Sequence, residues 1–432
     1  ESEEDTRTEG VLHNIYFNRG AAGSQAYARK FPGQKPDGDK PSSPQMKWLS
    51  RGLFEALIDF IGRARGPRYG LRAMLYEFEY KPVGEAFAAA AATGADVRIG
   101  YEAESYKTHN EAMISETGIA HLCFPQADRA GIRHNKFIVL LEDGNPVAVW
   151  TGSTNISDGG IFGHSNVGHE ILAPSIAERF MDFWTQLAAS DVEIESLKQA
   201  NRQLEPTPAR GALPPTDRIL TLFSPRDPVK SVPTLHWYGD VLASAKKWVG
   251  MTFAFNFDDI FKEALDADSE ALRYLLFDKS LNRSVEMDLS SDGRTVIASG
   301  AKLEAGDLEL FIGEELTGFN RNLYIHNKFI VVDPLGDDPL VVTGTANFSR
   351  SSQHTNDENM LVIRGDTRVG DIYFGEFLRI FDHLYTRYVI RRMRNTETSS
   401  TGAGFLKEHQ AQWLDGHFKG AKALRRRYFA GA

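Results

Sequence analysis

Short apolar runs alternate along the chain with longer segments in which apolar residues recur every three or four positions. In the first half, apolar runs at Leu71–Phe78 and Val97–Tyr101 flank a helical pattern at Val83–Ala92. A short turn that contains Gly94 separates this helix from the second strand. Strand–helix–strand units with short turns predict a parallel or mixed β-sheet that is covered by helices.

The second half of the chain repeats this order. It predicts a strand at Trp248–Phe255, a helix at Ile260–Ala267 and a strand at Leu272–Phe277. The entry strands are also alike, with Ile15–Arg19 matched by Leu222–Arg226. Three further helices are predicted from periodic, aromatic-rich segments, at Trp48–Ala64, Ile176–Leu187 and Gly375–Tyr388.

One hexapeptide, His-Asn-Lys-Phe-Ile-Val, occurs at residues 134–139 and again at residues 326–331. Each copy is followed, 18 residues after its histidine, by a turn of small residues. These turns are Gly152-Ser153-Thr154-Asn155 and Gly344-Thr345-Ala346-Asn347. An offset of 192 residues separates both the hexapeptides and the turns. We therefore predict a duplicated fold whose halves meet across a pseudo-two-fold axis to form one active site.

The predicted fold class is α/β, with two similar lobes, each a mixed β-sheet flanked by helices. We expect an N-terminal lobe at residues 1–204, a linker at 205–216, a C-terminal lobe at 217–394 and a basic tail at 395–432. Four prolines in Glu205–Pro215 indicate the linker. Residues 20–45 are rich in Gly, Pro, Lys and Ser, which predicts a long loop.

The composition is that of an ordinary globular protein, with 42% hydrophobic and 25% charged residues. A net charge of −9 gives no support to a general polyanion-binding protein, although a local basic cleft is compatible with it. The single cysteine excludes an intrachain disulfide, and no apolar run is long enough for a transmembrane helix. Because the chain begins at Glu1, a leader could have been removed, so the sequence leaves the compartment open.

The segment from Thr386 onwards carries ten basic and only three acidic residues. Within it, Asn395–Gly404 is expected to be a flexible loop, and Phe405–Phe429 a closing basic helix. A solvated helix that packs over one lobe is the favoured interpretation. The alternative is a binding arm, with its aromatic residues interleaved among the cations, that follows a phosphate backbone or lies on an anionic membrane.

Each hexapeptide presents a histidine and a lysine on the same face of a strand, because residues i and i+2 point the same way. The pairs are His134 with Lys136 and His326 with Lys328. A lone strand histidine is more often structural, but two identical pairs at one offset favour catalysis. The residues do not favour a zinc site, because lysine is a poor ligand and neither half has a paired ligand motif. We expect no metal and no cofactor.

This set of residues suits the cleavage of a phosphodiester. Lysine ammonium groups and the amides of Asn155 and Asn347 can bind the non-bridging oxygens. One imidazole can attack phosphorus, and the other can protonate the leaving oxygen and then activate water. A carboxylate would orient each imidazole, and the candidates that follow the turns are Glu170 and Glu358.

At these residues the chain resembles the phospholipase D superfamily, which is marked by two His-x-Lys-x-x-x-x-Asp motifs, each followed by Gly-Ser-x-Asn. The second copy matches at His326, Lys328, Asp333, Gly344, Thr345 and Asn347, with Thr345 in place of the usual serine. The first copy matches at His134, Lys136, Gly152, Ser153 and Asn155, with Leu141 in place of the aspartate. The resemblance covers residues 10–390 and implies a bilobal α/β fold with one metal-independent site that is complete within the chain.

The resemblance also implies roles for the site residues. His134 would be the nucleophile and His326 the general acid and base. Glu358 would act on His134 and Glu170 on His326, each across the interface between the lobes. Gly152, Ser153, Gly344 and Thr345 would support the phosphate site, and Asp333 would support a nearby loop.

The substrate class divides the superfamily into nucleases, phospholipases and phospholipid synthases. The segment Thr343–Ile363 resembles the small bacterial endonucleases, so a nuclease-like phosphodiesterase that acts on nucleic acid is our leading expectation. A phospholipase D acting on glycerophospholipid headgroups, with peripheral membrane contact, is the alternative. A third hypothesis is an inactive binding protein on the same fold, but the presence of both His/Lys pairs opposes it.

Overall fold

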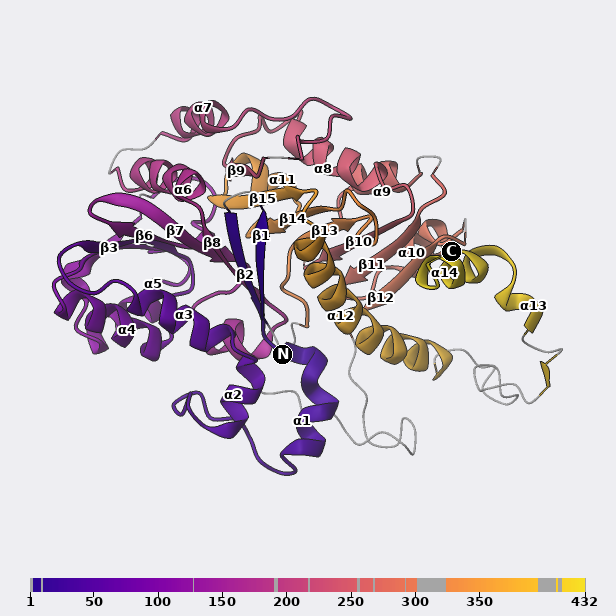
Figure 1. Cartoon of the computed structure of the whole chain (residues 1–432), viewed down its shortest axis with the longest axis horizontal. Helices are drawn as coiled ribbons and strands as arrows, with labels where there is room; N and C mark the ends of the chain where they lie inside the picture. Colours follow the sequence, from indigo (N-terminus) through magenta and orange to yellow (C-terminus); the bar gives the residue numbers. More distant parts are fainter. Residues whose placement is uncertain are drawn as a thin grey trace.

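The computed structural model of the chain describes residues 3–8, 11–126, 128–189, 193–216, 218–254, 257–266, 269–291, 293–300, 324–394, 409–410 and 414–431. These residues form two β-sheets with helices between them and on their outer faces (Figure 1). Each sheet mixes parallel and antiparallel pairs, which confirms the α/β class and the two-lobed arrangement expected from the repeat.

The first sheet has eight strands in the order β1-β2-β8-β7-β6-β3-β4-β5. Parallel pairs join β3 to β4 and β4 to β5, and the other neighbours are antiparallel. The strands are β1 (Glu3–Thr8), β2 (Val11–Phe17), β3 (Tyr69–Leu75), β4 (Asp96–Tyr101), β5 (Cys123–Pro125), β6 (Lys136–Glu142), β7 (Asn145–Gly152) and β8 (Val167–Leu172).

The second sheet has seven strands in the order β12-β11-β10-β13-β14-β15-β9. Without the edge strand β1, the first sheet has the same strand order as the second sheet read from its other end. The strands β2, β8, β7, β6, β3, β4 and β5 correspond in this order to β9, β15, β14, β13, β10, β11 and β12, so the sequence repeat is a repeat of topology. The strands are β9 (Leu220–Ser224), β10 (Trp248–Phe253), β11 (Leu272–Phe277), β12 (Thr295–Ser299), β13 (Phe329–Val332), β14 (Leu340–Gly344) and β15 (Glu358–Arg364).

The helices include one π-helical turn, η3, and several short elements. The described α-helices are α1 (Ser24–Lys30), α2 (Pro44–Ser50), α3 (Leu53–Gly62), α4 (Lys81–Ala92), α5 (Lys107–Glu116), α6 (Pro174–Leu187), α7 (Ile194–Leu204), α8 (Pro233–Ala243), α9 (Asp259–Asp266), α10 (Arg283–Leu289), α11 (Arg350–His354), α12 (Thr367–Arg394), α13 (Leu414–His417) and α14 (Gly420–Phe429). The remaining turns are η1 (Gly20–Gly23), η2 (Ala120–Leu122) and η3 (Gly159–Gly163). None of the helices in the described ranges is long and apolar enough to cross a bilayer.

A shared apolar core joins the two halves. It contains the inward faces of both sheets together with the apolar faces of α6 and α12, and aromatic pairs such as Phe183 with Phe223 cross it at a ring distance of 4.4 Å. Two further cores lie on the outer faces, against α3 and α4 in the first half and α8 and α9 in the second. Because strand residues alternate between these cores, both faces of each sheet are apolar, as expected for sheets covered on both sides.

The predicted elements differ from the structure at several ends. The helix expected at Trp48–Ala64 is two helices, because Arg51 and Gly52 adopt positive φ angles of 52° and 93° and end the first one. The loop expected at residues 20–45 contains the short helices η1 and α1. The helix expected at Gly375–Tyr388 is the middle of the longer α12. The predicted ends at Phe255 and Ala267 lie outside the described residues.

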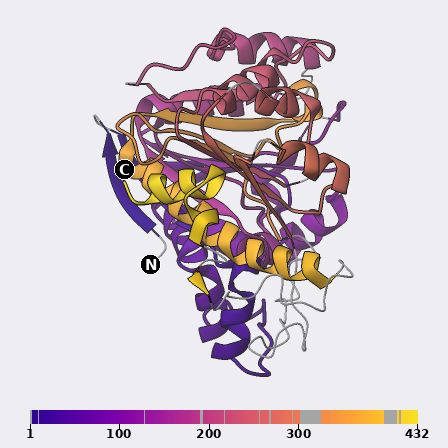
Figure 2. The same ribbon diagram turned by 90° about the vertical axis from the view of Figure 1, so that its right-hand side faces the viewer.

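The basic tail ends in a packed helix. Tyr428 of α14 stacks on Trp248 of β10, with 6.5 Å between ring centroids, and Phe429 stacks on Phe374 of α12 at 6.3 Å. Figure 2 shows α14 lying beside α12. Leu424 also packs against the shared core. Two of the tail aromatics proposed to stack on bases, Tyr428 and Phe429, therefore make packing contacts, whereas Phe418 is exposed. The predicted loop at Asn395–Gly404 lies outside the described residues.

We expect the double substitution Leu424→Ala/Tyr428→Ala to lower the free energy of unfolding by about 3 kcal/mol, because it removes apolar contacts with the core. Arg426→Ala, at an exposed position of the same helix, is the control and should change stability little. Urea denaturation measures both values. If α14 is only a closing helix, Arg426→Ala also leaves the salt dependence of nucleic-acid binding unchanged, whereas a phosphate contact would flatten it by about one unit of log–log slope.

Candidate functional site

The repeated motifs meet where strands of the two sheets begin or end. His134 lies two residues before β6, and His326 lies three residues before β13. The turns follow β7 and β14, which contact each other across the two halves. A short bridge between Ser165 and Ile325 links the same regions, with the Ser165 amide donating to the Tyr324 carbonyl at 3.1 Å. The motifs of the two halves therefore line one region between the sheets.

All four His and Lys side chains of the motifs are almost completely buried. His134, Lys136 and His326 are each 3% exposed, and Lys328 is fully buried. Buried ionisable groups are costly unless they have partners or a function, so four of them at one place mark a candidate active site.

His134 is held by a carboxylate from the other half. Its Nδ1 lies 2.8 Å from Oε2 of Glu358, the first residue of β15. Asn356 donates from its Nδ2 to the other carboxylate oxygen at 3.3 Å. Tyr76 contacts the imidazole edge to face, with ring centroids 4.8 Å apart. A carboxylate acceptor at Nδ1 keeps the proton there, so Nε2 carries the lone pair.

His326 is held by an amide instead. Its Nδ1 lies 2.9 Å from Oδ1 of Asn166, which also accepts a hydrogen bond from the Ser153 hydroxyl at 2.7 Å. The Nδ2 of Asn166 donates to the Gly160 carbonyl at 2.8 Å, which identifies Oδ1 as the acceptor. The His326 proton therefore resides on Nδ1, and Nε2 is again the reactive nitrogen.

The prediction that Glu170 partners His326 is wrong. Glu170 forms an ion pair with Arg63 and accepts a hydrogen bond from Asn14 Nδ2 at 3.0 Å. Glu170 lies on β8, four residues after Asn166, which directly precedes this strand. Four extended residues span about 13 Å. The offset of 192 residues relates Glu358 to Asn166, so the repeat itself indicated the right residue.

The two lysines adopt matching positions. Lys136 Nζ donates to the carbonyl of His134 at 2.6 Å, and Lys328 Nζ donates to the carbonyl of His326 at 2.7 Å. Lys136 Nζ also lies 4.8 Å from the centroid of the Tyr76 ring. An ammonium group has three donors, so each lysine can bind an oxyanion while keeping its backbone contact.

Burial and mutual repulsion lower the pKa values in this cluster. Burial, opposed by Glu358, lowers the pKa of His134 to about 4, and burial lowers the pKa of Lys136 to about 7. Burial and then the charge of Lys328 bring the pKa of His326 well below its usual value. Burial followed by the charge of Lys136 likewise lowers the pKa of Lys328. An anion that enters the cluster would relieve this repulsion, so the site is prepared for a negatively charged ligand.

The turns that follow β7 and β14 require glycine. Gly152 and Gly344 have φ angles of +133° and +158°. A Cβ on Gly152 would lie 2.3 Å from the Val167 carbonyl oxygen, and one on Gly344 would lie 2.2 Å from that of Asn359. Next to them, the Ser153 hydroxyl accepts from the Val167 amide at 3.1 Å and the Thr345 hydroxyl accepts from the Asn359 amide at 2.9 Å. Each turn is thereby fixed to the neighbouring strand.

We expect Gly344→Ala to lower the free energy of unfolding by about 3 kcal/mol or more, because backbone rather than a flexible side chain blocks the new methyl group. Gly375→Ala is the matched control, since it lies in helix α12 with open space around it and gains helix propensity. Thermal and urea unfolding of both variants measure the difference. Equal stability of the two variants would contradict the steric argument.

The two turn asparagines lie beside these glycines. Asn155 is buried, and the side-chain Oδ1 atoms of Asn155 and Asn347 have no hydrogen-bond partner among the described residues. These oxygens are acceptors, so the donors that each amide could offer to a phosphate are the hydrogens of its Nδ2. No three His, Cys, Asp or Glu side chains are arranged to hold a metal ion in the part of the chain that the structure describes.

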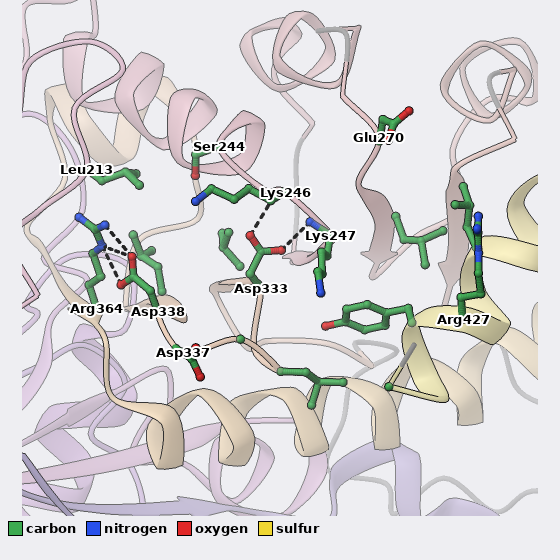
Figure 3. A pocket seen from close by; sticks show the side chains of 18 residues that line it. Leu213, Ser244, Lys246, Lys247, Glu270, Asp333, Asp337, Asp338, Arg364 and Arg427 are labelled. Carbon is green, nitrogen blue, oxygen red and sulfur yellow. Dashed lines mark hydrogen bonds and ion pairs between the residues drawn. The ribbon is translucent and has the colours of Figure 1, made fainter.

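Asp333 lies at the other end of β13, away from His326. Its carboxylate accepts from the backbone amides of Lys246, Lys247 and Trp248 at 2.8 to 2.9 Å, so it stabilises the loop that leads into β10. A pocket of about 650 Å³ opens beside it, between this loop and α14 (Figure 3). The pocket contains none of the His and Lys residues of the motifs and is separate from the candidate site.

Asn166, His164 and Tyr76 contact the reactive histidines but were not predicted. His164 lies beside His326 with 5.6 Å between ring centroids, and Tyr76 contacts His134. The 192-residue offset could have identified the first two, since it relates them to Glu358 and Asn356. No sequence signal marks Tyr76, because its position depends on how β3 ends.

Comparisons with known proteins agree with the two-lobed fold. Residues 242–384 match the family model described as "Cardiolipin synthase, PLD-like domain". No curated protein matches the chain. Among solved structures, phosphatidylserine synthase from Haemophilus influenzae is 12% identical, with 88% of this chain and 92% of the synthase covered at a TM-score of 0.52. This likeness shows the same two-lobed fold.

Two other solved structures resemble parts of the chain. Polyphosphate kinase from Porphyromonas gingivalis is 11% identical at a TM-score of 0.48, over 76% of this chain, which spans only 45% of the kinase. The phospholipase D family member Nuc from Salmonella typhimurium is 24% identical over 31% of this chain and 85% of Nuc, at a TM-score of 0.26. Residues 242–384 thus match a PLD-like domain, and the duplicated motifs and the two-lobed fold of the chain agree with the phospholipase D superfamily, whose enzymes act on phosphodiester bonds.

Proposed function

We propose that this protein hydrolyses phosphodiesters through a covalent phosphohistidine at His134, with His326 as general acid and then general base. The observation that carries this proposal is the difference between the two hydrogen-bond acceptors. Glu358 supports His134 with a carboxylate, whereas Asn166 supports His326 with a neutral amide.

The carboxylate suits the nucleophile. When Nε2 of His134 bonds to phosphorus, the imidazole ring becomes positively charged, and Glu358 at Nδ1 compensates that charge. Lys136 and Lys328, with the amides of Asn155 and Asn347, bind the non-bridging oxygens. These donors are held in place before the substrate arrives, so they stabilise the transition state without reorganising.

The amide suits the proton donor. The negative charge of a bound phosphodiester raises the pKa of His326, so that its Nε2 is also protonated in the complex. A neutral acceptor at Nδ1 stabilises this imidazolium less than a carboxylate would, so the Nε2 proton is more readily given to the leaving oxygen as the P–O bond breaks. In the second step, Nε2 of His326 takes a proton from water. The resulting hydroxide attacks phosphorus, the bond to His134 breaks, and both histidines return to their starting states.

The substrate we propose is a single strand of nucleic acid or a strand end. The segment Thr343–Ile363 resembles the bacterial endonucleases of the superfamily. The motif side chains are at most 3% exposed, and a flexible strand reaches buried groups more easily than a rigid duplex does. A phospholipid headgroup is the second candidate, favoured by the cardiolipin synthase family model and the full-length likeness to a phosphatidylserine synthase.

A parallel assay in chelator tests the proposal. The full chain is incubated with single-stranded and duplex oligonucleotides and with vesicles of phosphatidylcholine or phosphatidylethanolamine, each with and without added glycerol. We expect chelator-resistant cleavage of the single strand, with His134→Ala as the inactive control. Release of headgroups alone would favour the second candidate, and transfer to glycerol would identify a transferase rather than a hydrolase.

A further inference from the structure

The two halves differ at two corresponding positions beside the reactive histidines. In the second half, Asn356 and Glu358 form an Asn-x-Glu segment. The offset of 192 residues relates them to His164 and Asn166 in the first half. A third histidine has therefore taken the place of an asparagine next to the amide that holds His326.

The segment that carries His164 is held on both sides. The His164 amide donates to the Gly159 carbonyl at 2.8 Å, and its carbonyl accepts from Asn18 Nδ2 at 2.7 Å. The next residue, Ser165, accepts from the His326 amide at 3.1 Å. The backbones of His164 and His326 are thus joined through one intervening residue, which holds the two backbones close together.

The rings of His164 and His326 are close enough to interact electrostatically. Their centroids are 5.6 Å apart with planes inclined at 55°, and His164 is 6% exposed. Asn356 plays a different part, because its amide supports the Glu358 carboxylate. The first half thus has a titratable ring where the second half has a neutral amide.

We propose that His164 is a positioning residue for proton transfer, which makes His326 the stronger proton donor toward the leaving oxygen. This inference rests on the proposed function and deepens it by adding a residue that acts through His326. When His164 is protonated, its charge repels the proton on His326 Nε2 and favours its transfer as the P–O bond breaks. His164 keeps its own proton, so the proton balance of the reaction is unchanged.

Other charges also face His326. Lys328, His164, Lys136 and His134 each lower its pKa, in this order after burial. Glu358, Glu77 and Asp278 face Lys328 and oppose its depressed pKa. We have assigned Lys136 and Lys328 to phosphate binding, so replacing either lysine would also remove a contact with the phosphate oxygens. Replacing His164 changes the surroundings of the proton donor His326 and leaves those contacts in place.

The test is His164→Asn, which installs the residue found at the corresponding position of the second half. Turnover is measured on aryl phosphodiesters whose leaving phenols differ in acidity. We expect no loss for the p-nitrophenyl ester, which needs little protonation, and about a tenfold loss for the poorest leaving group. The limb of the pH profile of kcat that reports deprotonation of His326 should move to higher pH, because the repulsion is gone.

His383→Asn in α12 is the matched control, and it should leave both the leaving-group series and the pH profile unchanged. His164→Gln repeats the test with a different neutral side chain. Equal losses for all esters in His164→Asn, with an unmoved pH profile, would overturn the proposal and make His164 a packing residue. Absence of any phosphohistidine in the wild-type protein would instead contradict the proposed function. The failure of the His164 proposal and the failure of the proposed function are therefore distinguishable.

Discussion

Replacing His134 by alanine is expected to abolish turnover and the covalent phosphoenzyme together, whereas replacing His326 by alanine is expected to separate them. Without His326, a phosphodiester with a p-nitrophenyl leaving group can still react with His134, because that leaving group needs no proton. The adduct then accumulates, since no base activates water for the second step. We expect a burst of one p-nitrophenol per active site followed by turnover reduced by at least about 10³-fold.

Acid-quenched mass spectrometry measures this result by locating the added mass. The expected adduct lies on the peptide that contains His134. An added mass on the peptide that contains His326 would show that the roles of the two histidines are reversed. Full turnover in either single variant would contradict the two-histidine mechanism. Glu358→Gln is a useful companion, because it replaces the carboxylate at His134 with an amide like that of Asn166. It should slow formation of the adduct more than its hydrolysis, since the ring charge appears during attack.

Replacing Lys328 by methionine is expected to reduce kcat/KM by about 10²- to 10³-fold, because a preorganised positive charge is lost from the phosphate site. Arg426→Ala is the control for loss of one positive charge, since Arg426 is exposed on α14. Steady-state kinetics on one phosphodiester suffice to measure both. A loss confined to KM would indicate that Lys328 binds the substrate and the transition state equally.

The anion affinity should also depend on pH in a stated direction. Burial lowers the pKa of Lys136 to about 7, so Lys136 carries its charge below that pH and loses it above. Sulfate keeps the same charge throughout this range and is a suitable probe. We expect the affinity for sulfate, measured by calorimetry, to fall as the pH rises above about 7, because Lys136 loses its charge. The fall should extend over several pH units, because the bound anion raises the pKa of this lysine in the complex. Lys136→Met should flatten this dependence, and an unchanged curve would show that Lys136 does not face the anion.

Much of the arrangement followed from local patterns. The alternation of apolar runs and helical segments predicted the strands and helices of each half, because side-chain periodicity is set by the geometry of each element. The hexapeptide placed His134 and Lys136 on one strand end, and the 192-residue offset predicted that a second pair would join them. The glycines of both turns were also evident, since the repeat preserved them at the same spacing.

Other features depended on contacts that no local pattern encodes. Asn166 and Glu170 lie four residues apart in the chain, and the packing of the first half against the second places Asn166, and not Glu170, at His326. The helix expected at Trp48–Ala64 breaks because Arg51 takes a positive φ angle, which single-sequence periodicity does not predict. Tyr428 of the tail suits base stacking and core packing equally as a residue type, and only its contact with Trp248 shows that it packs.

By itself, therefore, the sequence determined the chemistry available to this protein, which is two imidazoles, two ammonium groups and two glycine turns in a duplicated α/β fold. The tertiary structure decided how that chemistry is divided. It gave His134 a carboxylate, gave His326 an amide and brought His164 beside the second of these rings. The physical reason is that side-chain periodicity acts over a few residues, whereas a hydrogen-bond partner is selected by the packing of strands that lie more than a hundred residues apart in the chain.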